Sequence, residues 1–165
     1  MKKLSIILLF IMSSLAVQAQ DDFISKHFPT LMENEKFTKV YFSAKMFSMM
    51  ANFTSAQEAE DFTAILPRLT GLRLVSSENI DGKPYYDKAL SVLKREKYEV
   101  LMEVSEEGAM TKFMMKEGSG GRISEFVMLS IDAQNITLIS LTGNMTMKDI
   151  NMISESSVME GLYKK

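Results

Sequence analysis

The hydrophobic period of the chain changes at about position 98, and this change constrains the fold more than any other feature. From there on, apolar and polar residues alternate with the period of two that marks β-strands, whereas earlier segments repeat at helical spacing. Short breaks rich in Gly, Glu or Asn divide this half, and each is brief enough for a hairpin. The pattern predicts a meander of four successive strands: Tyr98–Ser105, Ala109–Lys116, Arg122–Ile131 and Ile136–Thr142.

The first half mixes helix and strand signals. Ser55 and Glu58 form a capping box before a helical repeat, and Gly71 is expected to end that helix. This pattern predicts an α+β fold with two layers, a mixed but mostly antiparallel sheet and helices mainly on one face. The expected helices cover residues 22–32, 45–51, 55–69, 84–97 and a last segment from 146, and the expected early strands are Thr38–Ser43 and Leu72–Ser76.

The N-terminus has the features of a cleavable signal peptide. Lys2 and Lys3 precede an apolar run from Leu4 to Leu15, and Val17-Gln18-Ala19 supplies small residues for a signal peptidase. The run is too short to span a bilayer comfortably, which disfavours the alternative of an uncleaved anchor. We therefore expect a signal peptide over residues 1–19, cleavage after Ala19 or Gln20, and one α+β domain over residues 20–165. Its destination would be the periplasm or the cell envelope.

Composition excludes several classes of function. The chain has no cysteine, which removes disulfides, thiolate metal sites, cysteine nucleophiles and a lipid-modified N-terminal cysteine. Removal of Lys2 and Lys3 from the 19 basic residues leaves 17 against 21 acidic ones, a formal charge of −4 with scattered cations. Nucleic acid is therefore not an expected partner. No second apolar run reaches membrane length, so we expect no transmembrane segment after signal cleavage and a soluble protein without a lipid anchor.

No catalytic or metal-binding constellation emerges. His27 is the only histidine, and Ser91 and Lys94 match the S-x-x-K pattern of serine acyl enzymes without their companion motifs. The run Gly118-Ser119-Gly120-Gly121 lies between two strand patterns and is expected to be a hairpin turn rather than a phosphate cradle. Fifteen methionines include Met46-x-x-Met49 and Met145-x-Met147, spacings that resemble cuprous copper sites, but adaptable packing explains them better. We expect no enzyme activity, no metal and no cofactor.

Four strand-like segments of the chain resemble a known family. The segments are Val40–Met46, Tyr98–Val104, Ser124–Leu129 and Ile139–Met145. Together they resemble the secreted family catalogued as domain of unknown function 4252, which is typical of Bacteroidetes envelopes, and the similarity covers nearly all of the chain that follows the signal peptide. The resemblance implies an envelope location and, since such genes often lie near alternative sigma factors, a link to envelope signalling. It implies no activity or site residues, and the lipoprotein cysteine of several relatives is absent here.

The middle of the meander carries large apolar side chains on both faces, although a sheet covered on one side should be polar on the other. Only the strand at 98–105 is expected to alternate cleanly, with Tyr98, Val100, Met102 and Val104 on one face. The two-sided apolarity predicts either a partner surface or a face covered by the protein's own helices. The candidate binding residues are Leu101, Met114, Phe126 and Met128.

These observations lead to one hypothesis and one alternative. The hypothesis is a non-enzymatic envelope protein that binds another protein, or a second copy of itself as a homodimer, through the sheet face. The alternative is a periplasmic carrier of a small apolar ligand such as a lipid, in which flexible methionines line a closed cavity between helices and sheet.

Overall fold

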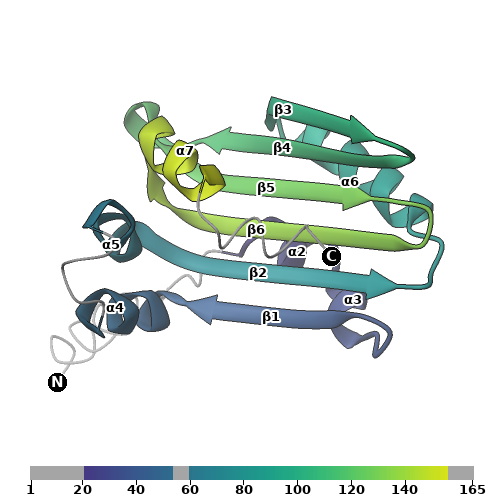
Figure 1. The fold of residues 1–165 in the computed structure, drawn as a ribbon, viewed down its shortest axis with the longest axis horizontal. Helices are drawn as coiled ribbons and strands as arrows, with labels where there is room; N and C mark the ends of the chain where they lie inside the picture. The colour runs from purple at the N-terminus through teal and green to yellow at the C-terminus, as the bar shows by residue number, and fades with distance from the viewer. Residues whose placement is uncertain (1–20, 54–59, 156–165) are drawn as a thin grey trace, which may run out of the picture.

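A computed structural model describes residues 21–53 and 60–155. Their strands form one sheet in which every neighbouring pair is antiparallel, with the order β1-β2-β6-β5-β4-β3 (Figure 1). The predicted α+β class and the meander from β3 to β6 are confirmed, whereas the described sheet is antiparallel throughout rather than mixed. β2 pairs with the remaining edge of β6, and β1, which α4 and α5 separate from β2 along the chain, pairs with the outer edge of β2. The strands are β1 Thr38–Ser43, β2 Leu69–Glu78, β3 Glu99–Glu106, β4 Ala109–Glu117, β5 Ile123–Ile131 and β6 Asn135–Met145.

The helices are short, and the predicted opening helix is divided in two. Phe28 has φ −131° and ψ 48° and separates α2 from α3, because the residue before a proline is driven out of the helical region and Pro29 follows. Within the described ranges, no helix has the length and apolarity needed to cross a membrane. The helices are α2 Phe23–His27, α3 Pro29–Glu33, α4 Ala44–Phe53, α5 Glu60–Ile65, α6 Lys83–Arg95 and α7 Met147–Glu155.

The helix expected over 55–69 is shorter than predicted, and the strand after it is longer. The capping box at Ser55 and Glu58 lies outside the described residues. α5 ends at Ile65, a 3₁₀ turn covers Leu66–Arg68, and β2 begins at Leu69. Pro67 explains the early end, because proline has no N–H to continue the helix. Gly71 lies inside β2, so it does not end the helix as expected.

Helices cover both faces of the sheet rather than mainly one. We call the two faces the α6 face and the α7 face. α2, α3 and α6 lie behind the sheet in Figure 1, whereas α5 and α7 lie in front of it. Because the central strands are apolar on both sides, both sides need cover, and the fold has three layers. The α6 face buries Val75, Met114, Val127, Leu129, Ile136 and Leu138. The α7 face buries Leu74, Phe113, Met115, Phe126, Met128, Ile139 and Leu141.

Candidate functional site

Three of the four predicted binding residues lie in the core. Met114 is 1% exposed and packs on the α6 face, while Phe126 and Met128 are 3% and 0% exposed on the α7 face. Since the two faces point in opposite directions, the structure does not bring the three side chains together. They are buried and offer no contact surface in this structure, which corresponds to the prediction that the protein covers its own sheet.

The fourth predicted residue, Leu101, lies on the edge strand β3. All eight residues of β3 are exposed, and among the described strands β3 pairs only with β4. Four of its side chains are apolar and more than a third exposed: Val100, Leu101, Met102 and Val104. An apolar strand with one side unpaired is a template for another strand. Since Met114, Phe126 and Met128 are buried, the accessible apolar surface at the predicted binding residues is β3, which contains Leu101.

A β-bulge at Leu101 changes the faces that were expected for β3. Val100 pairs with Met114, whereas Met102 pairs with Phe113, so the register shifts between them. Val100 consequently shares a face with Met114 and Met102 shares the opposite face with Phe113. The prediction that Val100 and Met102 lie on one face is wrong, because a bulge adds one residue that the period of two does not contain.

The opposite edge of the sheet is β1, which also pairs with only one described strand. Thr38, Lys39, Val40 and Tyr41 are exposed, and Val40 and Tyr41 are 37% and 56% exposed. The Arg73 guanidinium on β2 lies 4.6 Å from the centroid of the Tyr41 ring, a cation–π contact. The described sheet therefore ends on both sides in a strand with exposed residues, apolar ones among them.

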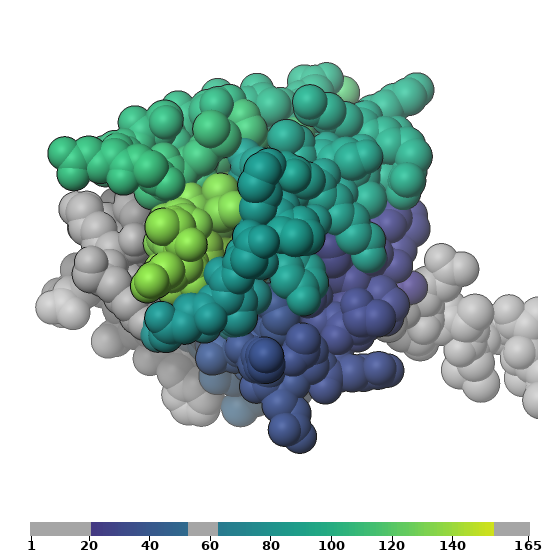
Figure 2. All heavy atoms as spheres, turned by 90° about the vertical axis from the view of Figure 1, so that its right-hand side faces the viewer, coloured from purple at the N-terminus to yellow at the C-terminus, as the bar shows by residue number. Residues whose placement is uncertain are grey.

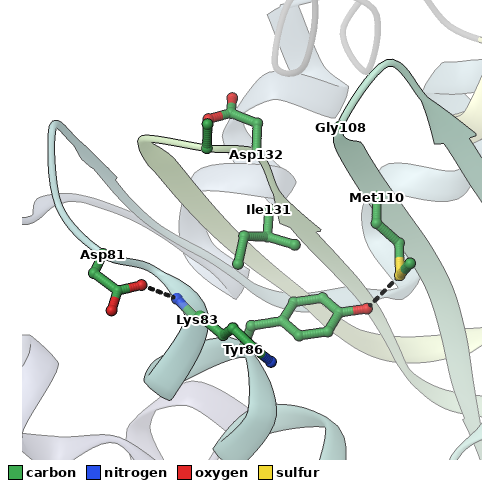
Figure 3. A pocket seen from close by; sticks show the side chains of 8 residues that line it. Asp81, Lys83, Tyr86, Gly108, Met110, Ile131 and Asp132 are labelled. Carbon is green, nitrogen blue, oxygen red and sulfur yellow. Dashed lines mark hydrogen bonds between the residues drawn. The ribbon is translucent and has the colours of Figure 1, made fainter.

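A partly open pocket of about 400 Å³ lies at one end of the sheet. The β5–β6 turn, the segment entering α6 and the β3–β4 turn come together at this end, which faces the viewer in Figure 2. The hydroxyl of Tyr86 donates to the Met110 sulfur at 3.0 Å across the pocket floor (Figure 3). The lining residues are Asp81, Lys83, Tyr86, Gly108, Met110, Ile131, Asp132 and Ala133.

The charged groups of this pocket already have partners within the fold. Lys83 Nζ lies 2.8 Å from a carboxylate oxygen of Asp87, and Asp81 accepts a hydrogen bond from the Lys83 backbone N–H at 3.1 Å. The Asp132 carboxylate accepts hydrogen bonds from the backbone N–H of Gln134 and Asn135. The pocket is thus a partly open depression lined by both charged and apolar residues, unlike the closed apolar cavity that a lipid carrier would need.

A buried carboxylate, Glu125 on β5, fastens α2 to the sheet. Its Oε1 accepts a hydrogen bond from the Phe23 backbone N–H at 2.7 Å and another from the Ser140 hydroxyl, and its Oε2 accepts one from Tyr98 at 2.6 Å. The pKa of Tyr98 is raised far above its usual range, mainly because the side chain is buried and further because the negative charge of Glu125 lies beside it. Tyr98 therefore stays protonated and donates to Glu125.

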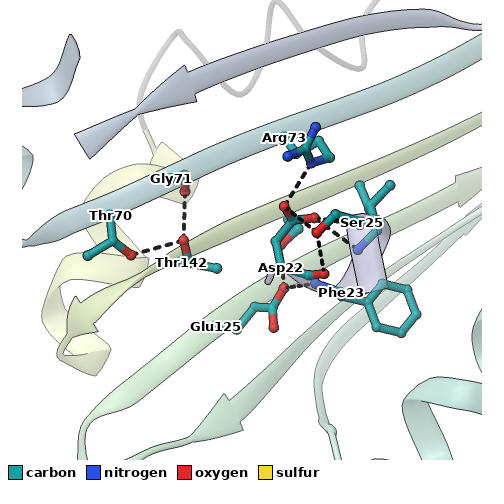
Figure 4. Close-up of polar contacts among 10 residues, drawn as sticks. Asp22, Phe23, Ser25, Thr70, Gly71, Arg73, Glu125 and Thr142 are labelled. Atoms are coloured by element: carbon teal, nitrogen blue, oxygen red, sulfur yellow. Dashed lines mark hydrogen bonds and ion pairs between the residues drawn. The ribbon is translucent and has the colours of Figure 1, made fainter. Parts of the chain in front are cut away.

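Asp22 extends the same cluster at the start of α2 (Figure 4). Its Oδ1 accepts from the backbone N–H of Ile24 and Ser25, both at 3.0 Å, as an N-cap does. Its Oδ2 accepts from Arg73 Nε at 2.7 Å. Across the described residues, no buried side-chain nitrogen or oxygen lacks a hydrogen-bond partner. The cluster is internally satisfied, and its evident role is to hold α2 against the sheet.

The residues with catalytic or metal-binding patterns do not converge. The His27 ring lies 5.4 Å from the Phe23 ring, and burial followed by the charge of Lys26 lowers its pKa. Ser91 and Lys94 are both exposed on α6, whereas Met145 is fully buried and Met147 is exposed. Among the described residues, no group of three or more His, Asp or Glu side chains could hold a metal ion.

Comparison with known proteins gives a family but no activity. None of the curated proteins matches the sequence of this chain. A family model described as Domain of unknown function (DUF4252) matches residues 30–153, a range that runs from α3 into α7 and includes the whole sheet. The chain therefore belongs to the DUF4252 family.

Proposed function

We propose that this protein is a non-enzymatic protein-interaction module of the cell envelope, and that it binds an extended segment of another polypeptide along β3. The observation that carries the proposal is the exposure of all eight residues of β3, four of them apolar, at an edge of the described sheet. β3 also includes Leu101, the one predicted binding residue that is exposed.

Strand addition explains how such an edge would bind. The outer side of β3 presents backbone N–H and C=O groups to an incoming strand, and main-chain hydrogen bonds then provide affinity. Side chains on alternate faces provide specificity. Glu99, Glu103 and Glu106 make the strand acidic, so the incoming segment should combine apolar with basic residues.

The envelope location rests on the signal-peptide pattern, residues 1–19, which lies outside the described residues. Family membership supports it only through the resemblance to secreted proteins, and a link to envelope signalling has the same basis. A periplasmic carrier of a small apolar ligand is the competing proposal. The pocket described above does not favour it, because it is partly open and the charged residues Asp81, Lys83 and Asp132 are among those that line it.

Native mass measurement of the protein purified gently from its own envelope tests these proposals. We expect a complex with another polypeptide or with further copies, and we expect Met102→Glu to abolish it without lowering the melting temperature. Met147→Glu is the matched control, because Met102 and Met147 are 46% and 45% exposed. A bare monomer would contradict the interaction proposal, and a few hundred daltons lost on denaturation would favour the carrier.

A further inference from the structure

We infer that the segment bound by β3 is β1 of a second copy of this chain, so that the sheet continues from one molecule into the next. This inference rests on the proposed function, since it names the partner of the same edge. Three observations carry it: the charges of the two edges, the directions of the edge strands and the register of the rows that cross the sheet.

The two edges have opposite charge. Between residues 36 and 45 the chain has three lysines and no acidic residue, whereas between residues 99 and 107 it has four glutamates and no basic residue. Like edges would therefore place equal charges side by side, which disfavours association of β1 with β1 or of β3 with β3. Unlike edges would attract. Lys39 lies in β1, Lys36 precedes the strand and Lys45 lies in the first turn of α4; Glu99, Glu103 and Glu106 lie in β3, and Glu107 follows it.

Strand direction allows the unlike edges to meet by simple translation. The order β1-β2-β6-β5-β4-β3 contains five antiparallel pairings, so β1 and β3 run in opposite directions, as their arrows show in Figure 1. A copy shifted sideways without rotation thus presents its β1 antiparallel to β3. The α6 faces of the two copies then lie on one side and the α7 faces on the other.

Directly paired residues on neighbouring strands form rows that cross the whole sheet from β1 to β3. The two end residues of a row would become neighbours in the proposed assembly, and their side chains are chemically compatible. One row begins at Val40 and ends at Met102, the next begins at Lys39 and ends at Glu103, and a third begins at Thr38 and ends at Val104. Continued into the next copy, the rows place Met102 beside Val40, Glu103 beside Lys39 and Val104 beside Thr38. The first row is Val40-Leu74-Ile139-Met128-Phe113-Met102, and the second is Lys39-Val75-Leu138-Leu129-Lys112-Glu103.

The proposed contact between Glu103 and Lys39 of the next copy resembles an ion pair that Glu103 already makes within the molecule. Lys112 on β4 already forms an ion pair with Glu103, on the α6 face. Lys39 of the next copy would approach the same carboxylate from the other side, and the Glu103 side chain is 46% exposed and accessible for it. The three charges would then alternate in sign across the junction, the arrangement that favours pairing between neighbouring strands.

Backbone hydrogen bonding also matches at the two edges. In an antiparallel sheet, a residue that bonds to one neighbouring strand points its N–H and C=O away from the other neighbour. Along each row, hydrogen-bonded and non-hydrogen-bonded pairs therefore alternate from one pair of strands to the next. After five pairings, the end residues of a row on β1 and on β3 both point their N–H and C=O groups outward or both point them inward, so the two edges can pair. The bulge at Leu101 lies beyond Met102 in these rows, and continuous pairing is expected over Met102–Val104.

Because β3 binds β1 rather than another β3, the contact is heterologous and each copy keeps one unused edge. Assembly by translation does not close on itself, so it produces open chains of copies rather than a defined dimer. The right-handed twist of the strands would turn successive copies relative to one another. This association therefore predicts a mass that rises with concentration without a plateau at two copies.

Charge reversal at the central contact tests the inference on the natively purified protein by sedimentation over a range of concentrations. We expect Lys39→Glu and Glu103→Lys each to weaken self-association at least about tenfold, because each sets like charges side by side. The double variant K39E/E103K, and an equimolar mixture of the two single variants, should both recover association. The charge-matched controls are Lys94→Glu, at an exposed position of α6, and Glu117→Lys, at the exposed end of β4.

The outcomes separate this inference from the proposed function. Loss in both single variants with recovery in the double variant and in the mixture supports β3–β1 association. Loss on Glu103→Lys but not on Lys39→Glu overturns it and leaves β3 as a binding edge for something else. A wild-type protein that stays monomeric, with no bound polypeptide in the native mass measurement, overturns both.

Discussion

The carboxylate of Glu125 should be essential for stability, and Glu125→Leu tests this most directly. The side chain is 7% exposed and accepts hydrogen bonds from the Phe23 backbone N–H, from Tyr98 and from Ser140. Leucine would leave three donors without an acceptor, and each unmade buried hydrogen bond costs about 1–3 kcal/mol. Burial of the leucine side chain returns about 1.5–3 kcal/mol. The three unmade hydrogen bonds together cost about 3–9 kcal/mol, so we expect a net loss of about 2–6 kcal/mol, a large part of a typical domain's stability.

Urea unfolding followed by circular dichroism measures this loss. For a slope of about 2 kcal/mol per M, the midpoint should fall by about 1–3 M. The matched control is Glu117→Leu, an exposed glutamate at the end of β4, which should change stability by no more than about 0.5 kcal/mol.

Hydrogen exchange distinguishes global from local effects of the same substitution. If Glu125 holds α2 to the sheet, the amides of α2 should lose protection in Glu125→Leu earlier than those of β5 and β6. Glu125→Gln keeps one acceptor oxygen and should cost less than Glu125→Leu. A loss below about 1 kcal/mol for Glu125→Leu would refute the reasoning, because it would show that the three donors find other partners.

Three further predictions concern other parts of the fold. Gly143→Ala should destabilise the protein by about 1–3 kcal/mol in thermal unfolding, because a Cβ there would lie 2.6 Å from the Arg68 carbonyl oxygen. Asp149→Ala should cost about 1–3 kcal/mol in urea unfolding, since the 2.6 Å ion pair with Arg68 is lost from a buried carboxylate; an unchanged midpoint would contradict this. Burial alone would raise the pKa of Asp132, but hydrogen bonds from Asn135 and from the Gln134 amide outweigh it and lower the pKa. This stabilisation of the β5–β6 turn should be present above the ordinary value of 3.8 and be lost as the pH falls through the lower folded value, and the NMR shift of the Gln134 amide should report it.

The local parts of the fold were predictable from the sequence. Period-two alternation and short breaks identified all four strands of the meander, and the Gly118–Gly121 segment is the β4–β5 turn, with φ of 68° and 69° at Gly120 and Gly121. These features depend on residues close to one another along the chain. The sequence also predicts large apolar side chains on both faces of β4 and β5, and both strands bury such side chains on both faces.

The site was less predictable, because its parts are set by long-range contacts. A buried residue and an exposed apolar residue look alike in sequence, so Phe126 and Met128 carried no sign that helices cover them. The sequence around Glu125 does not mark it as a buried acceptor, because its partners Phe23 and Ser140 lie 102 and 15 residues away. The bulge at Leu101 has no glycine to mark it. The lysines near β1 and the glutamates of β3 were the available signal for the edges, once the strand order was known.

The position of β6 determines when the sheet can be completed during folding. β6 lies between β2 and β5, although β2 ends at Glu78 and β6 begins only at Asn135. The β3–β6 meander closes through short hairpin loops, and local contacts of this kind form fast, whereas the β2–β6 pairing must wait for a distant segment. β1 and β2, which are joined through α4 and α5, are synthesised first, but β2 has no β6 to pair with until the meander has been made. Until β2 pairs with it, the edge of β6 that faces away from β5 is unpaired and can form wrong strand pairings. We therefore expect the β2–β6 pairing to be a slow step in folding and β6 to be the strand that chaperones protect.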